Sequence, residues 1–124
     1  MPRYAAIDIG SNSVRMMAAE TDRGGPLKIL AEDRQVTRLG ESVFRTGSIA
    51  APALDFLCSI LPRMVAAYKP LGVLATRAVA TAAVRDASNG EEFVQRVSEI
   101  LGQPVEIISG QEEARLIHLG VETR

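Results

Sequence analysis

Apolar and polar positions in the first third of the chain form short strand-like segments separated by turn residues. Tyr4–Ile9 and Ser13–Glu20 predict two strands that run back beside each other. The cluster Thr21-Asp22-Arg23-Gly24-Gly25-Pro26 favours a turn. Leu27–Thr37 then predicts a third strand, polar enough to lie at an edge. Together these segments predict an antiparallel meander.

The remaining pattern alternates between helical and strand-like periods. In Pro52–Lys69 and Asn89–Leu101, apolar residues recur every three or four positions, so each segment predicts a helix with one buried face. Gly102 and Pro104 favour an end to the second helix. We further expect a strand buried on both faces, a short strand and a final helix, at Leu71–Val79, Val105–Ile108 and Gln111–Glu122 respectively.

This order of elements predicts an α/β fold. A meander followed by two crossover units gives a five-stranded mixed sheet with helices packed on it. It is the ribonuclease-H-like arrangement of the actin-like ATPase superfamily, which also includes sugar kinases and acetate kinase. We expect residues 1–124 to form one domain of this kind.

Composition excludes several other classes of protein. A hydrophobic share of 47% supports a packed core, and a net charge of -1 is unlike the basic balance of a nucleic-acid binder. No apolar run is long enough to span a membrane, and the N-terminus leads directly into a strand-like segment. The single cysteine, Cys58, fits a reducing compartment. We therefore expect a cytoplasmic protein with neither nucleic-acid nor membrane partners.

The loop between the first two predicted strands is a candidate phosphate site. Gly10 allows a tight turn, and the main-chain N–H groups of Ser11, Asn12 and Ser13 can converge on one anion. Asp8 ends the preceding strand and could hold a hydrated Mg²⁺ ion beside that anion. The same residues also favour an ordinary hairpin, so both interpretations stay open. The loop is not a Walker A motif, because it lacks the Gly-Lys-Ser/Thr ending.

Two adjacent glutamates begin the last predicted helix. Ser109-Gly110-Gln111-Glu112 matches a capping box, which gives Glu112 a structural role. Glu113 instead shares the apolar face, where a carboxylate is costly unless it is paired or functional. It could orient and deprotonate an attacking water, although a partly exposed glutamate at a helix start is the commoner case.

Several arginines are candidate phosphate ligands. Arg85 follows the predicted strand Leu71–Val79, and ligands of parallel sheets bind at the carboxyl ends of strands. Its planar guanidinium suits phosphate oxygens, although a solvated surface arginine is the commoner case. Arg15, Arg38 and Arg77 are weaker candidates, and Arg38 could either bind phosphate or simply end its strand.

Four segments together resemble the exopolyphosphatase/guanosine-pentaphosphate phosphohydrolase (Ppx/GppA) family. The resemblance is collinear across nearly the whole chain, and the last segment is the most specific. The segments are Ala5–Arg15, Val36–Glu41, Val79–Ala87 and Val105–Leu116.

The resemblance implies hydrolysis of terminal phosphoanhydride bonds in inorganic polyphosphate or guanosine pentaphosphate, with a divalent metal such as Mg²⁺. It makes Glu113 the general base that activates water. It also implies that Arg85 and the loop Gly10–Ser13 bind phosphate and that Asp8 helps to hold the metal. A homodimer stays open as the assembly of the full-length protein.

The family also has a second phosphate loop, similar to Asp-Ile-Gly-Gly-Gly-Ser, soon after the glutamate helix. Residues 1–124 contain no such loop. We therefore expect this chain to be an N-terminal subdomain, truncated before that loop and without full activity alone. An ATP-dependent phosphotransferase related to acetate or sugar kinases stays open, as does a non-catalytic module that binds polyphosphate or guanosine alarmones. The segment Ser109–Leu116 favours the hydrolase over the kinase.

Overall fold

A five-stranded mixed sheet forms the centre of the molecule, with strand order β3-β2-β1-β4-β5. The structure is a computed structural model that describes residues 2–21, 26–80, 84 and 86–108. The strands are β1 (Arg3–Ile9), β2 (Ser13–Glu20), β3 (Lys28–Val36), β4 (Ala75–Ala80) and β5 (Glu106–Ile107). The helices are α1 (Leu39–Thr46), α2 (Ala51–Tyr68), the short 3₁₀ helix η1 (Lys69–Leu71) and α4 (Gly90–Leu101).

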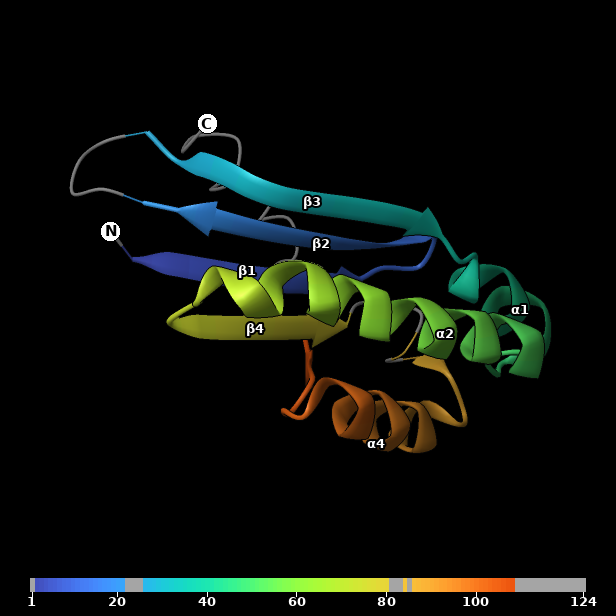
Figure 1. The fold of residues 1–124 in the computed structure, drawn as a ribbon. Helices are drawn as coiled ribbons and strands as arrows, with labels where there is room; N and C mark the ends of the chain where they lie inside the picture. The colour runs from blue at the N-terminus through green and yellow to red at the C-terminus, as the bar shows by residue number, and fades with distance from the viewer. Residues whose placement is uncertain (1, 22–25, 81–83, 85, 109–124) are drawn as a thin grey trace.

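The pairing of the strands confirms the predicted meander and crossovers. β1 pairs antiparallel with β2, and β2 pairs antiparallel with β3, which lies at the edge of the sheet as predicted. β4 returns parallel to β1 on its other side, and β5 runs parallel to β4. β1 therefore lies at the middle of the sheet, with its carboxyl end beside the carboxyl end of β4 (Figure 1).

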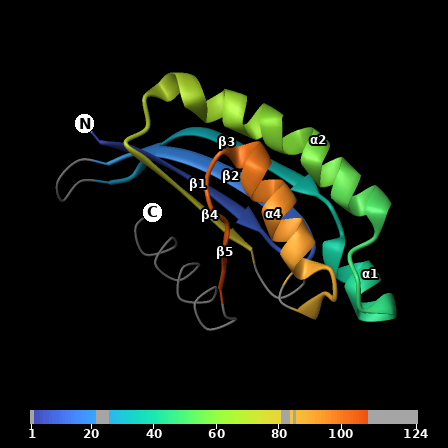
Figure 2. The same cartoon turned by 90° about the horizontal axis from the view of Figure 1, so that it is seen from below.

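Helices α2 and α4 pack against each other on one face of the sheet (Figures 1 and 2). Alternate residues of the two central strands face these helices and are buried, as a period of two requires. The core consists of apolar residues from both layers, among them Ile7, Ile9, Val14, Met16, Leu57, Leu61, Met64, Phe93 and Val97. This core fixes the sheet edge from which the loops of the candidate site extend.

Three sequence predictions differ from the structure. Residues 39–46 form α1, where we predicted no helix. The fourth strand begins at Ala75 rather than Leu71, because Pro70 lies in a 3₁₀ turn and Gly72 takes a left-handed φ of 66°. Only the last half of β4 is buried, so this strand is not buried on both faces throughout. The helix predicted at Gln111–Glu122 lies outside the described residues.

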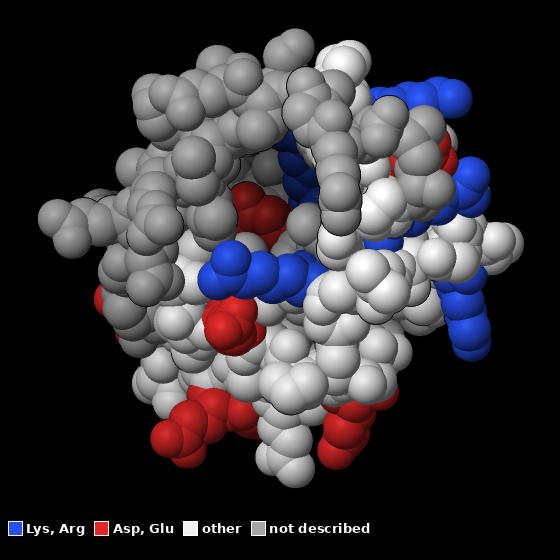
Figure 3. Space-filling model, turned by 90° about the vertical axis from the view of Figure 1, so that its left-hand side faces the viewer, with Lys and Arg blue, Asp and Glu red and all other residues white. Residues whose placement is uncertain are grey.

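Ion pairs join the sheet to its helices and the helices to each other. Arg63 of α2 reaches Asp33 of β3 at 2.8 Å, and Arg96 of α4 reaches Asp55 of α2 at 3.1 Å. Charged side chains of both signs also occur on the end of the molecule shown in Figure 3. Among the described residues, no helix is long and apolar enough to cross a membrane.

The Asp33–Arg63 pair makes stability depend on pH. Burial acts to raise the pKa of Asp33, but hydrogen bonds from Arg63 and Gln35 outweigh it and hold this pKa below its ordinary value. Because the pKa is depressed in the folded state, the pair stabilises the protein above the ordinary aspartate range. That stabilisation is lost as the pH falls through the lowered pKa.

We predict that Arg63→Ala raises the pKa of Asp33 toward 3.8, its ordinary value. The free energy of unfolding at neutral pH should fall by no more than about 1 kcal/mol, because both partners are partly exposed. Carboxyl-carbon NMR titration and urea unfolding measure the two effects. Arg96→Ala, which removes the other ion pair of α2, is the control and should leave the titration of Asp33 unchanged. An identical Asp33 titration in both variants would contradict this account.

Candidate active site

The connection between β1 and β2 is a tight loop with two available main-chain donors. The N–H of Gly10 donates to the carbonyl of Ser13 at 3.0 Å, which closes the turn and leaves Ser11 and Asn12 at its tip. Within the described part of the chain, the N–H groups of Ser11 and Asn12 donate no hydrogen bond. Adjacent unused N–H groups of this kind favour the binding of an anion.

The carbonyl groups of the same two residues are held by the segment that starts α1. The N–H groups of Thr37 and Arg38 both donate to the Asn12 carbonyl at 3.0 Å, and Gly40 N–H donates to the Ser11 carbonyl at 2.7 Å. Arg38, directly before α1, has a left-handed φ of 55°. This conformation turns the chain from β3 into α1. The hydrogen bonds from this segment then fix the shape of the loop.

Gly40 allows α1 to approach the loop this closely. A Cβ atom at position 40 would lie 3.0 Å from Ser11 Cβ and 3.2 Å from Ser11 O. Such contacts are tighter than ordinary van der Waals packing, so any larger residue would push the loop or the helix away. The pattern Arg38-Leu39-Gly40 thus combines a turn with a close approach.

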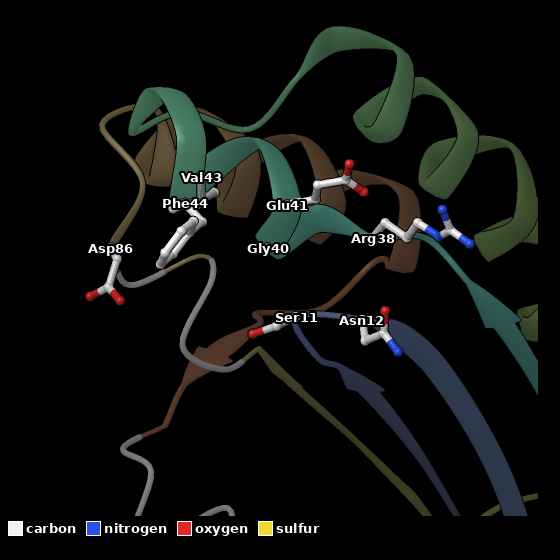
Figure 4. A pocket seen from close by; sticks show the side chains of 8 residues that line it. All are labelled: Ser11, Asn12, Arg38, Gly40, Glu41, Val43, Phe44 and Asp86. Atoms are coloured by element: carbon white, nitrogen blue, oxygen red, sulfur yellow. The ribbon is translucent and has the colours of Figure 1, made fainter.

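An open pocket of about 610 Å³ lies beside this loop (Figure 4). Its wall consists of the loop tip, α1 and a residue that precedes α4. Phe44 and Asp86 lie at one side of the pocket, and the side chain of Ser11 points toward that side (Figure 4). The guanidinium of Arg38 points in the opposite direction. The lining residues are Ser11, Asn12, Arg38, Gly40, Glu41, Val43, Phe44 and Asp86.

Hydrogen bonds join the chain just after α1 to the chain at the start of α4. The amide of Asn89 accepts a hydrogen bond from Ile49 N–H at 2.9 Å and donates one to the Ile49 carbonyl at 3.2 Å. Ser88 N–H donates to the Gly47 carbonyl at 2.7 Å, directly after α1. These bonds hold the segment after α1 against the segment that carries Asp86.

The model of the Ppx/GppA phosphatase family matches residues 13–124, which is most of the chain. The chain belongs to the Ppx/GppA phosphatase family. A solved family member from Aquifex aeolicus is 37% identical, with a TM-score of 0.87, and the match covers 97% of this chain and 39% of that one. An exopolyphosphatase from Cytophaga hutchinsonii is 25% identical, with a TM-score of 0.83, covering 92% of this chain and 36% of that one.

The fold is that of the actin-like ATPases, as predicted. The ethanolamine utilization protein EutJ from Carboxydothermus hydrogenoformans, another protein of this fold, matches with a TM-score of 0.54 at 14% identity. That match covers 88% of this chain and 37% of EutJ, and it concerns the fold alone. This Ppx/GppA chain spans well under half the length of the solved family members that it matches.

The structure brings together some of the predicted site residues. Ser11 and Asn12 line the pocket, while Gly10 and Ser13 close the turn behind them and do not line it. Arg38 lines the pocket, and its guanidinium forms no hydrogen bond or ion pair within the described residues. The predicted phosphate ligand Arg85 and the predicted general base Glu113 both lie outside the described residues.

The two other weaker candidates for phosphate binding, Arg15 and Arg77, form ion pairs with glutamates of the sheet. Arg15 forms an ion pair with Glu32 of β3, and Arg77 pairs with Glu106 of β5 at 3.0 Å. Both pairs link neighbouring strands of the sheet. Neither arginine is among the residues that line the pocket of this Ppx/GppA chain.

Asp8 occupies the penultimate position of β1, opposite Arg15 in β2 and Val79 in β4. Its Oδ1 atom is buried. Among the described residues, no three His, Cys, Asp or Glu side chains are grouped closely enough to enclose a metal. A single carboxylate next to a candidate phosphate loop nevertheless fits Mg²⁺, which keeps several waters and takes substrate phosphates as ligands.

The sequence predictions include neither α1 nor a role for Phe44, although the sequence contains a signal for this helix. Glu41 in the first turn, Arg45 in the last turn and Gly47 after it are typical of a short helix with its C-terminal cap. Glu41 and Arg45 form an ion pair at 3.1 Å, four residues apart. Recognising this pattern would have placed Phe44 on a helix beside the loop.

We predict that Asn89→Ala lowers the free energy of unfolding by about 1–3 kcal/mol, because it leaves two partly buried polar groups of Ile49 without their partner. Denaturant unfolding measures the change. Asn12→Ala is the matched control, since the Asn12 side chain is exposed and forms no hydrogen bond within the described residues. Equal stability of the two variants would show that the Asn89 bonds contribute nothing.

Proposed function

We propose that this chain supplies the first phosphate loop and the general base of a hydrolase. The enzyme would remove the terminal phosphate from inorganic polyphosphate or guanosine pentaphosphate. The main support is that a chain belonging to the Ppx/GppA family carries a loop with two available N–H groups beside an open pocket. The exopolyphosphatase from Cytophaga hutchinsonii shares the fold of this chain.

In this proposal the loop binds the phosphate at the end of the substrate. The N–H groups of Ser11 and Asn12 donate to phosphate oxygens, and the Ser11 hydroxyl adds a third donor. Arg85 supplies a planar guanidinium that can donate two parallel hydrogen bonds to the same group. Donors that are already in place stabilise the charge that develops as the phosphate is transferred.

Glu113 is the general base in the proposed reaction. Its carboxylate takes a proton from a water molecule whose oxygen attacks the terminal phosphorus. The bond from that phosphorus to the bridging oxygen breaks, and the bridging oxygen leaves with the shortened chain. Orthophosphate and a polyphosphate or nucleotide one phosphate shorter are the products.

Among the described residues, Asp8 is the one that we propose to hold a divalent metal. When bound, Mg²⁺ would neutralise charge on the phosphate oxygens. The carboxylate of Asp8 suits this role because Mg²⁺ in phosphoryl-transfer sites is often held by only one or two carboxylates, with water and phosphate completing its ligands.

We predict that Glu113→Gln, in the full-length protein, lowers turnover by about 10²–10⁴-fold while substrate binding is retained, because the amide cannot accept the proton from water. Phosphate release from polyphosphate and from guanosine pentaphosphate, with Mg²⁺, measures turnover. Glu112→Gln is the matched control, since glutamine serves in a capping box as well as glutamate does. Unchanged turnover in Glu113→Gln would exclude the general-base role.

We also predict that Asp8→Asn raises the Mg²⁺ concentration needed for half-maximal phosphate release by about tenfold, because the site loses a charged ligand. A chelator should abolish release by the unmodified protein. Asp55→Asn, an exposed carboxylate on α2, is the control and should leave the Mg²⁺ requirement unchanged. A requirement equal in all three proteins would remove Asp8 from the metal site.

A further inference from the structure

A second pocket, of about 550 Å³, lies between α1 and the start of α2. It is distinct from the pocket at the β1–β2 loop, although Arg38 and Glu41 contribute to the walls of both. Phe56 is 44% exposed, so part of its ring is available for contact. A mostly apolar wall with few polar groups is typical of small-molecule sites. The apolar residues of α2 and its start that line the pocket are Ala50, Pro52, Ala53 and Phe56.

Most polar side chains around this second pocket already have partners. Arg45 forms an ion pair with Glu41 at 3.1 Å, four residues apart on α1. Ser42 Oγ accepts a hydrogen bond from the N–H of Ala50 at 2.9 Å, which joins α1 to the start of α2. Thr46 Oγ1 donates to the Ser42 carbonyl at 2.8 Å. These groups hold the wall of the pocket together and need no ligand.

Two polar groups of the same wall have no partner among the described residues. The guanidinium of Arg38 forms no hydrogen bond or ion pair there, and it points away from the Ser11 side of the first pocket (Figure 4). The Oγ1 atom of Thr37 is buried and also has no hydrogen-bond partner. Buried hydroxyl groups are nearly always hydrogen-bonded, so this one indicates a partner that the described residues do not supply.

The charges around the second pocket favour a ligand with a single negative charge. Glu41 and Arg45 neutralise each other, which leaves the charge of Arg38 unbalanced. α2 begins at this pocket with no side-chain cap and no acidic residue in its first turn, so its partial positive charge is unbalanced too. A polyanion would also meet the Glu41 carboxylate. A monocarboxylate can instead pair with the guanidinium of Arg38 through two parallel hydrogen bonds.

We propose that the second pocket binds a small aromatic monocarboxylate. The carboxylate pairs with the Arg38 guanidinium, and the aromatic ring packs against Phe56 and Pro52. The proposal is independent of the proposed hydrolysis, since neither Ser11 nor Asp8 lines this pocket. The ligand contacts residues 37–41, the segment whose main-chain N–H groups hold the β1–β2 loop.

The test uses three probes with the full-length protein: 3-phenylpropanoate, its neutral amide 3-phenylpropanamide, and acetate. Ligand-observed NMR titration measures the affinity of each. The amide should bind about tenfold more weakly than 3-phenylpropanoate, because it has no charge to pair with Arg38. Acetate has the charge but no ring, and it should also bind about tenfold more weakly, because it buries little apolar surface.

Two variants of Arg38 test the guanidinium. Arg38→Met keeps an apolar stem of similar length but removes the charge, so it should reduce the affinity for 3-phenylpropanoate to that for the amide. Arg38→Lys should restore part of the affinity, since an ammonium keeps the charge without the planar pair of donors. Arg77→Met removes an arginine outside this pocket and is the control, which should leave the affinity unchanged.

A matched pair of phenylalanine variants tests the ring. Phe56→Ala should weaken the binding of 3-phenylpropanoate by about threefold to tenfold, as expected for the loss of one aromatic pair. Phe44→Ala removes a ring that lines only the first pocket, and it should leave this binding unchanged. Thermal unfolding checks that each variant retains its fold. If Phe56→Ala unfolds, Phe56→Leu takes its place and should show a smaller loss in the same direction.

Equal affinity for 3-phenylpropanoate and its amide, or unchanged affinity in Arg38→Met, would overturn the proposal, because the guanidinium would then play no part. Loss of binding in Phe44→Ala but not in Phe56→Ala would place the probe in the first pocket and overturn it as well. Tripolyphosphate with Mg²⁺ should leave the probe bound, and displacement of the probe would also place it at the phosphate loop. If no probe binds, the site is wrong, while phosphate release tests the proposed hydrolysis separately.

Discussion

The candidate site depends on the hydrogen bonds between the β1–β2 loop and the start of α1. Three main-chain N–H groups, from Thr37, Arg38 and Gly40, donate to the carbonyls of Ser11 and Asn12. Because the carbonyls are engaged on one side of the loop, the N–H groups of the same two residues are left for a ligand. The left-handed backbone of Arg38 and the missing Cβ of Gly40 make this contact possible. A loop that could equally be an ordinary hairpin thus becomes a candidate anion site through its neighbour.

The sequence predicts the sheet well because its signals there are local. Alternating burial in β1 and β2 and the apolar stripe of α4 each follow from a short segment of chain. The predicted start of β4 was wrong because residues 71–74 have the composition of a strand. Pro70 and Gly72 nevertheless impose a turn there. Composition alone does not decide between these conformations.

The site was predicted less completely, because its geometry depends on contacts between distant segments. The tip residues Ser11 and Asn12 were found from their chemistry. Asn89 begins a helix predicted from the sequence, but nothing there indicates that its side chain holds the backbone of Ile49, forty residues away. The exposure of Phe44 follows from the orientation of α1, a helix that was not predicted from the sequence. These are tertiary facts, which local propensity cannot supply.

The central place of β1 in the sheet has a consequence for how the protein folds. β1 can pair with β2 early, since a short loop joins them, but its parallel partner β4 arrives only after β3, α1 and α2. Long-range parallel pairing has a large loop-closure cost and is slow. The pocket is lined by residues of the β1–β2 loop and of α1, and by Asp86, which follows β4 in the chain. The hairpin can therefore form before the pocket does, and during synthesis the pocket is completed only after the chain has passed Asp86.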